Sequence, residues 1–248
     1  MLNTRVIILA AGKGTRMKSE IPKPLITVAG EPMVSRLIRS VKESGVDVKP
    51  IVVVSALNER MFRKALGDSV DYAVQKEQLG TGHAVKSARE AIGNADRVIV
   101  LYGDHPFLRP EVIREIAGLQ EMNPRAFVML TATVPDFEGD FQTFVRWGRI
   151  LRDEARHVVA IREAKDATFD ELGITEVNPA IFAFPTDWAW NQLEMLKNTN
   201  ASGEYYLTDL VAAAMQAGMP IVTASAEPFD VIGINSPEEL AQAESLRR

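Results

Sequence analysis

The stretch RVIILAAGKGTRM, residues 5–17, joins an apolar run to a turn that is rich in glycine and cations. The run Arg5–Ala10 is apolar beyond its first residue and rich in branched side chains, so we predict a strand that is buried on both faces of a parallel sheet. In open parallel sheets, ligands bind beyond the carboxyl ends of the strands. The turn after Ala10 therefore stands where a ligand site is expected.

This turn has the residue types of a phosphate-binding loop. Gly12 and Gly14 permit backbone conformations that bring N–H groups close to an anion. Arg16 and Lys23 can add charge-assisted contacts to phosphate oxygens. The dinucleotide fingerprint would need a third glycine where Met17 stands, and the Walker sequence G-x-x-x-x-G-K-[ST] does not occur. A purely structural turn stays open as the alternative.

Strands and helices alternate through the first part of the chain. Further apolar runs occur at Pro50–Ala56, Arg97–Tyr102 and Phe127–Val134. Helical periodicity marks the segments Pro32–Ser44, Thr81–Ile92 and Pro110–Met122. This alternation predicts an α/β fold in which helices cover both faces of a parallel sheet.

The pattern changes from about Phe141. We expect strands at Arg146–Arg152, His157–Glu163 and Ile174–Phe184, then helices at Pro185–Lys197 and Tyr205–Gly218, then short strands at Ile221–Ala224 and Phe229–Ile234. Ser236-Pro237-Glu238-Glu239 begins the last helix with a capping box. The second half of the sheet is therefore predicted to be partly antiparallel.

Composition excludes several classes of function. A net charge of −5 provides no basic field for nucleic acid. There is no long apolar run for a membrane span and no signal peptide, so we expect a cytoplasmic protein without membrane partners. Without cysteine there is no disulfide and no thiolate nucleophile. The sequence does not indicate an oligomeric state.

Two further stretches supply candidate ligand groups. QKEQLGTGHA, Gln75–Ala84, leads from a strand through a glycine-bracketed turn into a helix, and the Gln75 amide offers a donor and an acceptor for a pyrimidine edge. A helix N-terminus capped by Thr81 is the plainer interpretation. In VIVLYGDHPFL, Val98–Leu108, Asp104 follows a buried strand, where a carboxylate can bind Mg²⁺ together with phosphate oxygens or can simply cap a turn.

Together these stretches resemble the sugar nucleotidyltransferases, and nearly the whole chain resembles the uridylyltransferase domain of bacterial N-acetylglucosamine-1-phosphate uridylyltransferases. The matching stretches are Leu9–Met17, Pro22–Pro24, Gln75–Ala84, Tyr102–Asp104, Gly148–Ile150, Glu163, Lys165–Thr168, Glu176–Asn178, Gly203–Leu210 and Gly233–Asn235. The blocks QLGTGHA and GEYYLTDL are specific to this branch. Members of this family usually carry an acetyltransferase half as well, and we do not extend that activity to this chain.

The resemblance implies a doubly wound, mostly parallel α/β fold that joins UTP to a sugar 1-phosphate and uses Mg²⁺ as cofactor. It implies nucleotide contacts at Ala10, Ala11, Gly12, Gly14, Gln75, Gly80 and Thr81, catalytic phosphate contacts at Arg16 and Lys23, metal ligands at Asp104 and Asn235, and sugar contacts at Tyr102, Gly148, Glu163 and Asn178. The implied organisation is one domain over residues 1–248, with a nucleotide-binding half at about 1–140, a sugar-binding half at about 141–235 and a C-terminal helix at 236–248.

The chain departs from this family on the sugar and metal side. Pro179-Ala180 follows Asn178 where the family usually has a small polar residue and glycine, and FQTFVRWGRI, Phe141–Ile150, is bulkier than the usual P-T-G-Y-G-R-I. His105 stands where a small apolar residue is usual. The stretches that would contact uridine keep the family pattern, so UTP is a firmer expectation than N-acetylglucosamine 1-phosphate. Another sugar phosphate, another nucleotide or a non-catalytic nucleotide-sugar-binding protein remain as alternatives.

Overall fold

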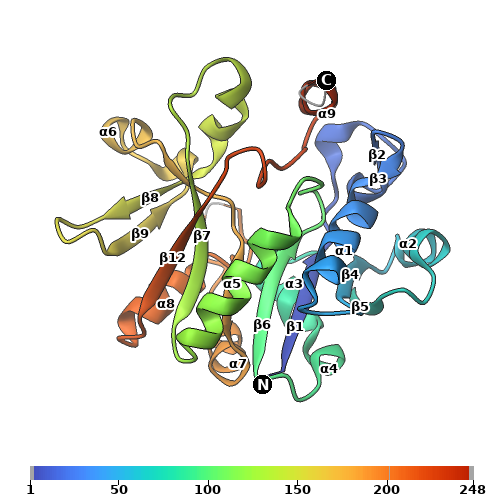
Figure 1. The fold of residues 1–248 in the computed structure, drawn as a ribbon, viewed down its shortest axis with the longest axis horizontal. Helices are drawn as coiled ribbons and strands as arrows, with labels where there is room; N and C mark the ends of the chain where they lie inside the picture. Colours follow the sequence, from blue (N-terminus) through green and yellow to red (C-terminus); the bar gives the residue numbers. More distant parts are fainter. Residues whose placement is uncertain (1–2, 201, 246–248) are drawn as a thin grey trace.

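One mixed sheet of ten strands runs through the computed structural model, which describes residues 3–200 and 202–245 (Figure 1). Its strands are β1 (Thr4–Leu9), β4 (Ile51–Ser55), β5 (Asp71–Gln75), β6 (Arg97–Tyr102), β7 (Phe127–Thr133), β8 (Gly148–Arg152), β9 (Val158–Arg162), β10 (Glu176–Asn178), β11 (Phe182–Pro185) and β12 (Ile221–Ala226). The order is β5-β4-β1-β6-β11-β7-β10-β8-β9, and β12 pairs with β7. A separate short hairpin joins β2 (Thr27–Val28) to β3 (Glu31–Pro32).

The first half of the sheet is parallel, as the apolar runs predicted. β5, β4, β1 and β6 are neighbours with parallel pairing throughout. Their register brings Leu9 beside Tyr102 and Ser55 beside Gln75, so the carboxyl ends of β1, β5 and β6 lie along one edge. The glycine-rich turn after β1 and the turn that follows Gln75 therefore open on the same side of the sheet.

The second half contains the antiparallel strands. β11 lies between β6 and β7 and is antiparallel to both, while β10 is antiparallel to β7 and β8. β9 is antiparallel to β8, and β12 runs parallel to β7, so only β9, β10 and β11 oppose the common strand direction within the described residues. The predicted doubly wound α/β class with a partly antiparallel second half is confirmed.

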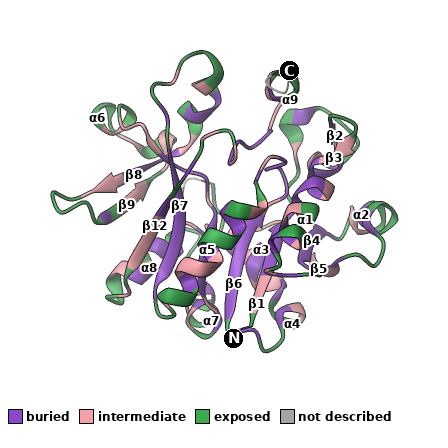
Figure 2. Cartoon of the chain, in the orientation of Figure 1, coloured by how far each residue is buried: buried purple, intermediate pink, exposed green. Residues whose placement is uncertain are grey.

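Helices cover both faces of the sheet (Figures 1 and 2). They are α1 (Met33–Ser44), α2 (Glu59–Leu66), α3 (Thr81–Ser87), α4 (Arg89–Ile92), α5 (Pro110–Met122), α6 (Phe169–Leu172), α7 (Thr186–Met195), α8 (Asp209–Gln216) and α9 (Pro237–Ser245). One core packs α1, α2 and α5 against the sheet, and a second core packs α3, α4, α7 and α8 on the other face. Figure 2 shows the buried strands between these layers, with exposed residues on the outer helix surfaces.

Four predicted elements were wrong in their extent or existence. The helix expected over Tyr205–Gly218 begins only at Asp209. The helix expected over Thr81–Ile92 is interrupted at Ala88 into α3 and α4. The strand expected over Ile174–Phe184 is divided into β10 and β11, because Pro179 lacks an N–H group and Ala180 has a φ of 59°. Residues 229–234 form no strand, although Ile234 is buried and its N–H donates to the Asp104 carbonyl at 3.0 Å.

The amphipathic helix α2 was not predicted, and residues 246–248 of the expected C-terminal helix lie outside the described residues. Burial of a loop gives the same apolar pattern as burial of a strand, which explains the error at 229–234.

A buried carboxylate fixes the amino-terminal end of the parallel sheet. Asp47 accepts hydrogen bonds from the Arg5 guanidinium, the Val6 N–H and the Lys49 N–H, each at 2.9 Å. Asp71 accepts from the same guanidinium at 2.8 Å, but it is about one-third exposed, whereas the Asp47 side chain is 6% exposed. Asp47 therefore connects the start of β1 to the segment that leads into β4.

Replacing Asp47 is expected to destabilise the protein more than replacing Asp71. Asp47→Ala leaves a buried N–H and a partly buried guanidinium without an acceptor, so we expect the free energy of unfolding to fall by about 3 kcal/mol. Asp71→Ala removes a more exposed charge from the same arginine and is expected to cost about 1 kcal/mol or less. Urea denaturation of both variants measures the difference, and equal losses would contradict this role of Asp47.

Candidate functional site

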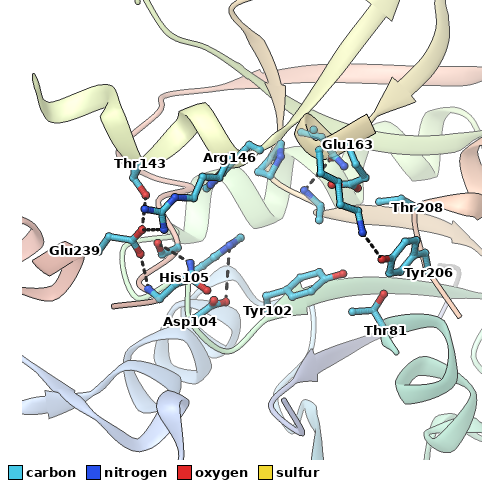
Figure 3. A pocket seen from close by; sticks show the side chains of 18 of the residues that line it. Thr81, Tyr102, Asp104, His105, Thr143, Arg146, Glu163, Tyr206, Thr208 and Glu239 are labelled. Atoms are coloured by element: carbon cyan, nitrogen blue, oxygen red, sulfur yellow. Dashed lines mark hydrogen bonds and ion pairs between the residues drawn. The ribbon is translucent and has the colours of Figure 1, made fainter. Parts of the chain in front are cut away.

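Two adjoining cavities lie at the carboxyl edge of the sheet. The loop cavity, of about 410 Å³, is bounded by the turn after β1, the turn after β5 and Lys23. The central cavity, of about 360 Å³, lies between the end of β6 and the second-half strands (Figure 3). Thr81, Tyr102 and Asp104 line both. The cavities thus share one wall, as two substrates that must meet would require.

The loop cavity gathers most of the residues that were predicted to hold a nucleotide. Its walls include Ala10, Ala11, Gly12, Lys23, Gln75, Gly80 and Thr81. Gly14 does not line it but supports it: Gly14 has a φ of 60°, and a Cβ there would lie 2.9 Å from the Lys23 Cβ. The sequence reading missed Lys13, Thr15, Gln78 and Glu204, which also line this cavity. The Gln78 amide donates to the Ala11 carbonyl, a contact that only the tertiary structure shows.

The turn after β5 is closed by a distant segment. Gly80 has a φ of 110°, and a Cβ there would lie 2.6 Å from the Tyr205 carbonyl oxygen. The Tyr205 N–H donates to the Leu79 carbonyl at 2.8 Å, and the Tyr205 carbonyl accepts from the Gly82 N–H at 2.8 Å. Thr81 does not cap the helix with its side chain; its hydroxyl accepts from the Leu207 N–H at 3.0 Å. QLGTGHA and GEYYLTDL therefore form one structural unit.

A charged cluster stands where the two cavities meet. The Lys23 ammonium donates to the Asp104 carboxylate and, at 2.9 Å, to the Asn235 side-chain oxygen. Arg16 donates to the same Asn235 oxygen at 2.9 Å and lines the central cavity. Burial alone would raise the pKa of Asp104, but the neighbouring Lys23 and His105 reverse this, so its pKa lies below the ordinary range and the carboxylate is ionised. The four predicted catalytic and metal-binding side chains thus meet at one point.

Glu239 holds Asn235 in place. Its carboxylate accepts from the Asn235 N–H at 2.6 Å and from the Thr143 hydroxyl at 3.0 Å, and its own N–H donates to the Ser236 hydroxyl at 3.2 Å. The predicted capping box is therefore only half formed, because the carboxylate bonds to the residue before the cap instead of to the cap itself. Thr143 and Glu239 also line the central cavity, and the sequence reading missed both.

The central cavity contains the residues that were predicted to contact the sugar. Tyr102, Gly148, Glu163 and Asn178 line it, and Figure 3 shows Tyr102 and Glu163 among the side chains at its wall. Three further lining residues, Arg146, Tyr206 and Thr208, were not predicted, whereas Lys165, which the resemblance placed near the sugar pocket with a surface turn as the alternative, does line the cavity. The Lys165 ammonium donates to the hydroxyls of Ser202 and Tyr206, each at 2.9 Å. This contact closes the cavity between β9 and the segment before α8, and the matching Lys165–Thr168 and Gly203–Leu210 stretches were its only sequence signal.

Two of the three departures from the family pattern pack against one another. The buried His105 ring stacks between Tyr102 and Trp147, with ring centroids 6.0 and 6.2 Å apart. Trp147 in turn contacts the buried Phe144, at 4.7 Å between centroids. Aromatic pairs at such distances add to the stability gained from burial. The bulk at 144–147 and the histidine after Asp104 are therefore one coordinated feature of the central cavity wall.

Glycine turns at the carboxyl edge of a doubly wound sheet, with a second cavity against them, stand where open α/β sheets bind their ligands. A crystal structure from Bacillus anthracis, provisionally described as a glucose-1-phosphate thymidylyltransferase in complex with sucrose, has this fold. Its TM-score is 0.78 at 19% identity, and the match covers 99% of this chain and 95% of that one.

The chain belongs to the family described as the MobA-like NTP transferase domain, which matches residues 6–201. The bifunctional protein GlmU of Burkholderia multivorans is 40% identical over 247 residues, which are 98% of this chain and 52% of that protein. The bifunctional protein GlmU of Heliobacterium modesticaldum is 41% identical over 242 residues, or 97% and 51% of the two chains. These matches confirm the predicted family, and the chain spans about half the length of these relatives.

Gly80→Ala is expected to separate the turn after β5 from Tyr205. Both Gly80 and Gly93 have positive φ, but a Cβ at Gly93 meets nothing within 4 Å. Gly93→Ala should therefore cost only the backbone strain, about 1–2 kcal/mol of unfolding free energy. Gly80→Ala should cost about 2 kcal/mol more, because the Tyr205 backbone must move. Urea denaturation measures both, and equal costs would show that the close approach to Tyr205 adds nothing.

Glu163→Gln is expected to stabilise the protein at neutral pH. Burial raises the pKa of Glu163, the neighbouring Asp166 and Asp209 raise it further, and Lys165 opposes them. A carboxyl whose pKa is higher in the folded state loses folding free energy as the pH rises from the unfolded pKa through the folded one. The glutamine variant should therefore have a higher free energy of unfolding at pH 7, and this advantage should vanish below about pH 4.

Urea denaturation across this pH range measures the effect, with Glu20→Gln at an exposed position as the control. A Glu163→Gln variant that is less stable than the parent at pH 7 would contradict the raised pKa of Glu163 in the folded protein.

Proposed function

We propose that this protein transfers uridylyl from UTP to a sugar 1-phosphate, with N-acetylglucosamine 1-phosphate as the first candidate, and releases pyrophosphate. The single observation that carries the proposal is the meeting of Arg16, Lys23, Asp104 and Asn235 at the wall shared by the two cavities. The similarity to the GlmU proteins supports it from a separate direction. UTP would occupy the loop cavity and the sugar phosphate the central cavity.

The donor atoms at the junction suit Mg²⁺. One carboxylate and one amide oxygen already converge on a single cation, the Lys23 ammonium, so they lie close enough to share another. Among residues 3–200 and 202–245 there is no cluster of three or more His, Cys, Asp or Glu that could hold a metal by itself. Mg²⁺ commonly uses one or two protein carboxyl or carbonyl oxygens and completes its shell with phosphates and water. Bound between Asp104 and Asn235, it would neutralise charge on the phosphates.

The remaining chemistry is positioning and electrostatics. A sugar phosphate is already an oxyanion at neutral pH, so the attack on the α-phosphorus of UTP requires no general base from the protein. As pyrophosphate leaves, the negative charge on the phosphates is stabilised by the Arg16 guanidinium and the Lys23 ammonium. The loop after β1 aligns the triphosphate, while Glu239 keeps Asn235 oriented. The chain thus supplies cations and alignment.

The proposed partners are small molecules. A net charge of −5 does not favour nucleic acid. No helix within the described residues has both the length and the hydropathy of a membrane span. We propose a cytoplasmic site of action, where UTP is available.

Lys23→Ala is expected to lower the rate of pyrophosphate release by about a hundredfold, because it removes a cation that stabilises the leaving phosphates. Lys49→Ala makes the same chemical change at an exposed ion pair with Asp71 and should retain full activity. The assay is pyrophosphate release from a panel of four nucleoside triphosphates, each with several sugar 1-phosphates and Mg²⁺. Release that requires UTP and an acetamido sugar phosphate is the expected result.

Two outcomes of this panel would replace the proposal. Release with a different sugar phosphate or nucleotide would keep the chemistry and change the substrate, and the stacked His105 and Trp147 wall would explain a different acceptor. Tight binding of a UDP-sugar without turnover in any mixture would indicate a non-catalytic binding protein.

A further inference from the structure

The Gln75 amide nitrogen has two hydrogen-bonding partners. Gln75 ends β5, is 3% exposed and lines the loop cavity. Its Nε2 donates to the Gly80 carbonyl oxygen, and His83 Nδ1 lies 3.1 Å from the same nitrogen. An amide nitrogen has two N–H groups, so these two partners use both. Within the described residues no protein donor bonds to the Gln75 side-chain oxygen.

Hydrogen-bonding chemistry determines whether the nitrogen or the oxygen of the Gln75 side chain faces Gly80. The Gly80 carbonyl only accepts, so the nitrogen of Gln75 must face it. His83 Nδ1 must then carry a lone pair, because a proton there would point at the second N–H of the amide. If His83 Nδ1 instead carried a proton, the amide would have to turn and would lose its bond to Gly80. With its Nδ1 lone pair toward the amide nitrogen, His83 therefore leaves the Gln75 oxygen as the free hydrogen-bonding atom at the cavity wall.

We propose that His83 is a positioning residue that sets the nucleobase preference of the loop cavity by locking the orientation of the Gln75 amide. This inference rests on the proposed use of UTP. A fixed carbonyl oxygen accepts from the N3–H of uracil, whereas cytosine has an unprotonated N3 at that edge and would be repelled. A site built around one such hydrogen bond rejects the analogue that lacks the donor more strongly than an apolar pocket does. His83 itself contacts neither base nor phosphate in this scheme.

The decisive comparison uses two substitutions at one position. His83→Leu removes the acceptor and frees the amide to turn, so the affinity for UTP should fall and the ratio of UTP to CTP affinity should fall by about tenfold or more. His83→Asn places an amide oxygen near the position of Nδ1 and should restore the parent ratio. If His83 were merely structural, its replacement would lower the affinities for UTP and CTP together and leave their ratio unchanged.

The measurement is the dissociation constant of UTP and of CTP, by calorimetry, for the parent and both variants, with Lys86→Met on the same helix as control. His83→Ala replaces His83→Leu if the leucine variant does not fold. An unchanged ratio in the leucine or alanine variant, or equal loss in His83→Leu and His83→Asn, would overturn the proposal. So would a parent protein that binds the two nucleotides equally.

The test separates this proposal from the function above because binding does not require turnover. If pyrophosphate release fails while the UTP preference depends on His83 as described, the uridylyl transfer is wrong and the role of His83 stands. If release succeeds with UTP while the preference is unaffected by His83, only the role of His83 is wrong.

Discussion

The site depends on one ammonium group that holds three distant segments together. Lys23 reaches Asp104, 81 residues later, and Asn235, 212 residues later. Because Asp104 is buried, its charge requires such a partner, and removing the lysine would leave a desolvated carboxylate. The same attraction that stabilises the fold therefore assembles two oxygen ligands and a cation at the place where the substrates would meet.

Two kinds of structure support this junction. The loop cavity is built on parallel strands whose backbone pairing is regular from β5 to β6, so the glycine turns start from a rigid edge. The central cavity is assembled from loops and short strands, and its wall is closed by side-chain contacts such as Lys165 with Tyr206. Variation between relatives is easier to accommodate in the second region, and the stacked His105 and Trp147 lie there.

Agreement between the sequence analysis and the structure follows the same division. β6 and α5 were predicted to the residue, since an uninterrupted apolar run and a helix with proline at its first position give strong local signals. Residues 229–234 were misread because Val231, Ile232 and Ile234 are buried although they lie in a loop. The roles of Glu239 and Gln78 were missed, since each depends on a partner that local sequence does not indicate.

By itself the sequence determined the α/β class, the glycine turns after β1 and β5, and the residue types that suit a nucleotide. Those features depend on local backbone preferences and on hydrophobic periodicity, which neighbouring residues encode. Only the tertiary structure decided that Lys23 joins Asp104 to Asn235, that a Cβ at Gly80 would clash with Tyr205, and that His83 Nδ1 lies beside the Gln75 amide nitrogen. The physical reason is that hydrogen bonds and close contacts of these kinds depend on ångström-scale positions, which arise only when the packed sheet brings remote segments together.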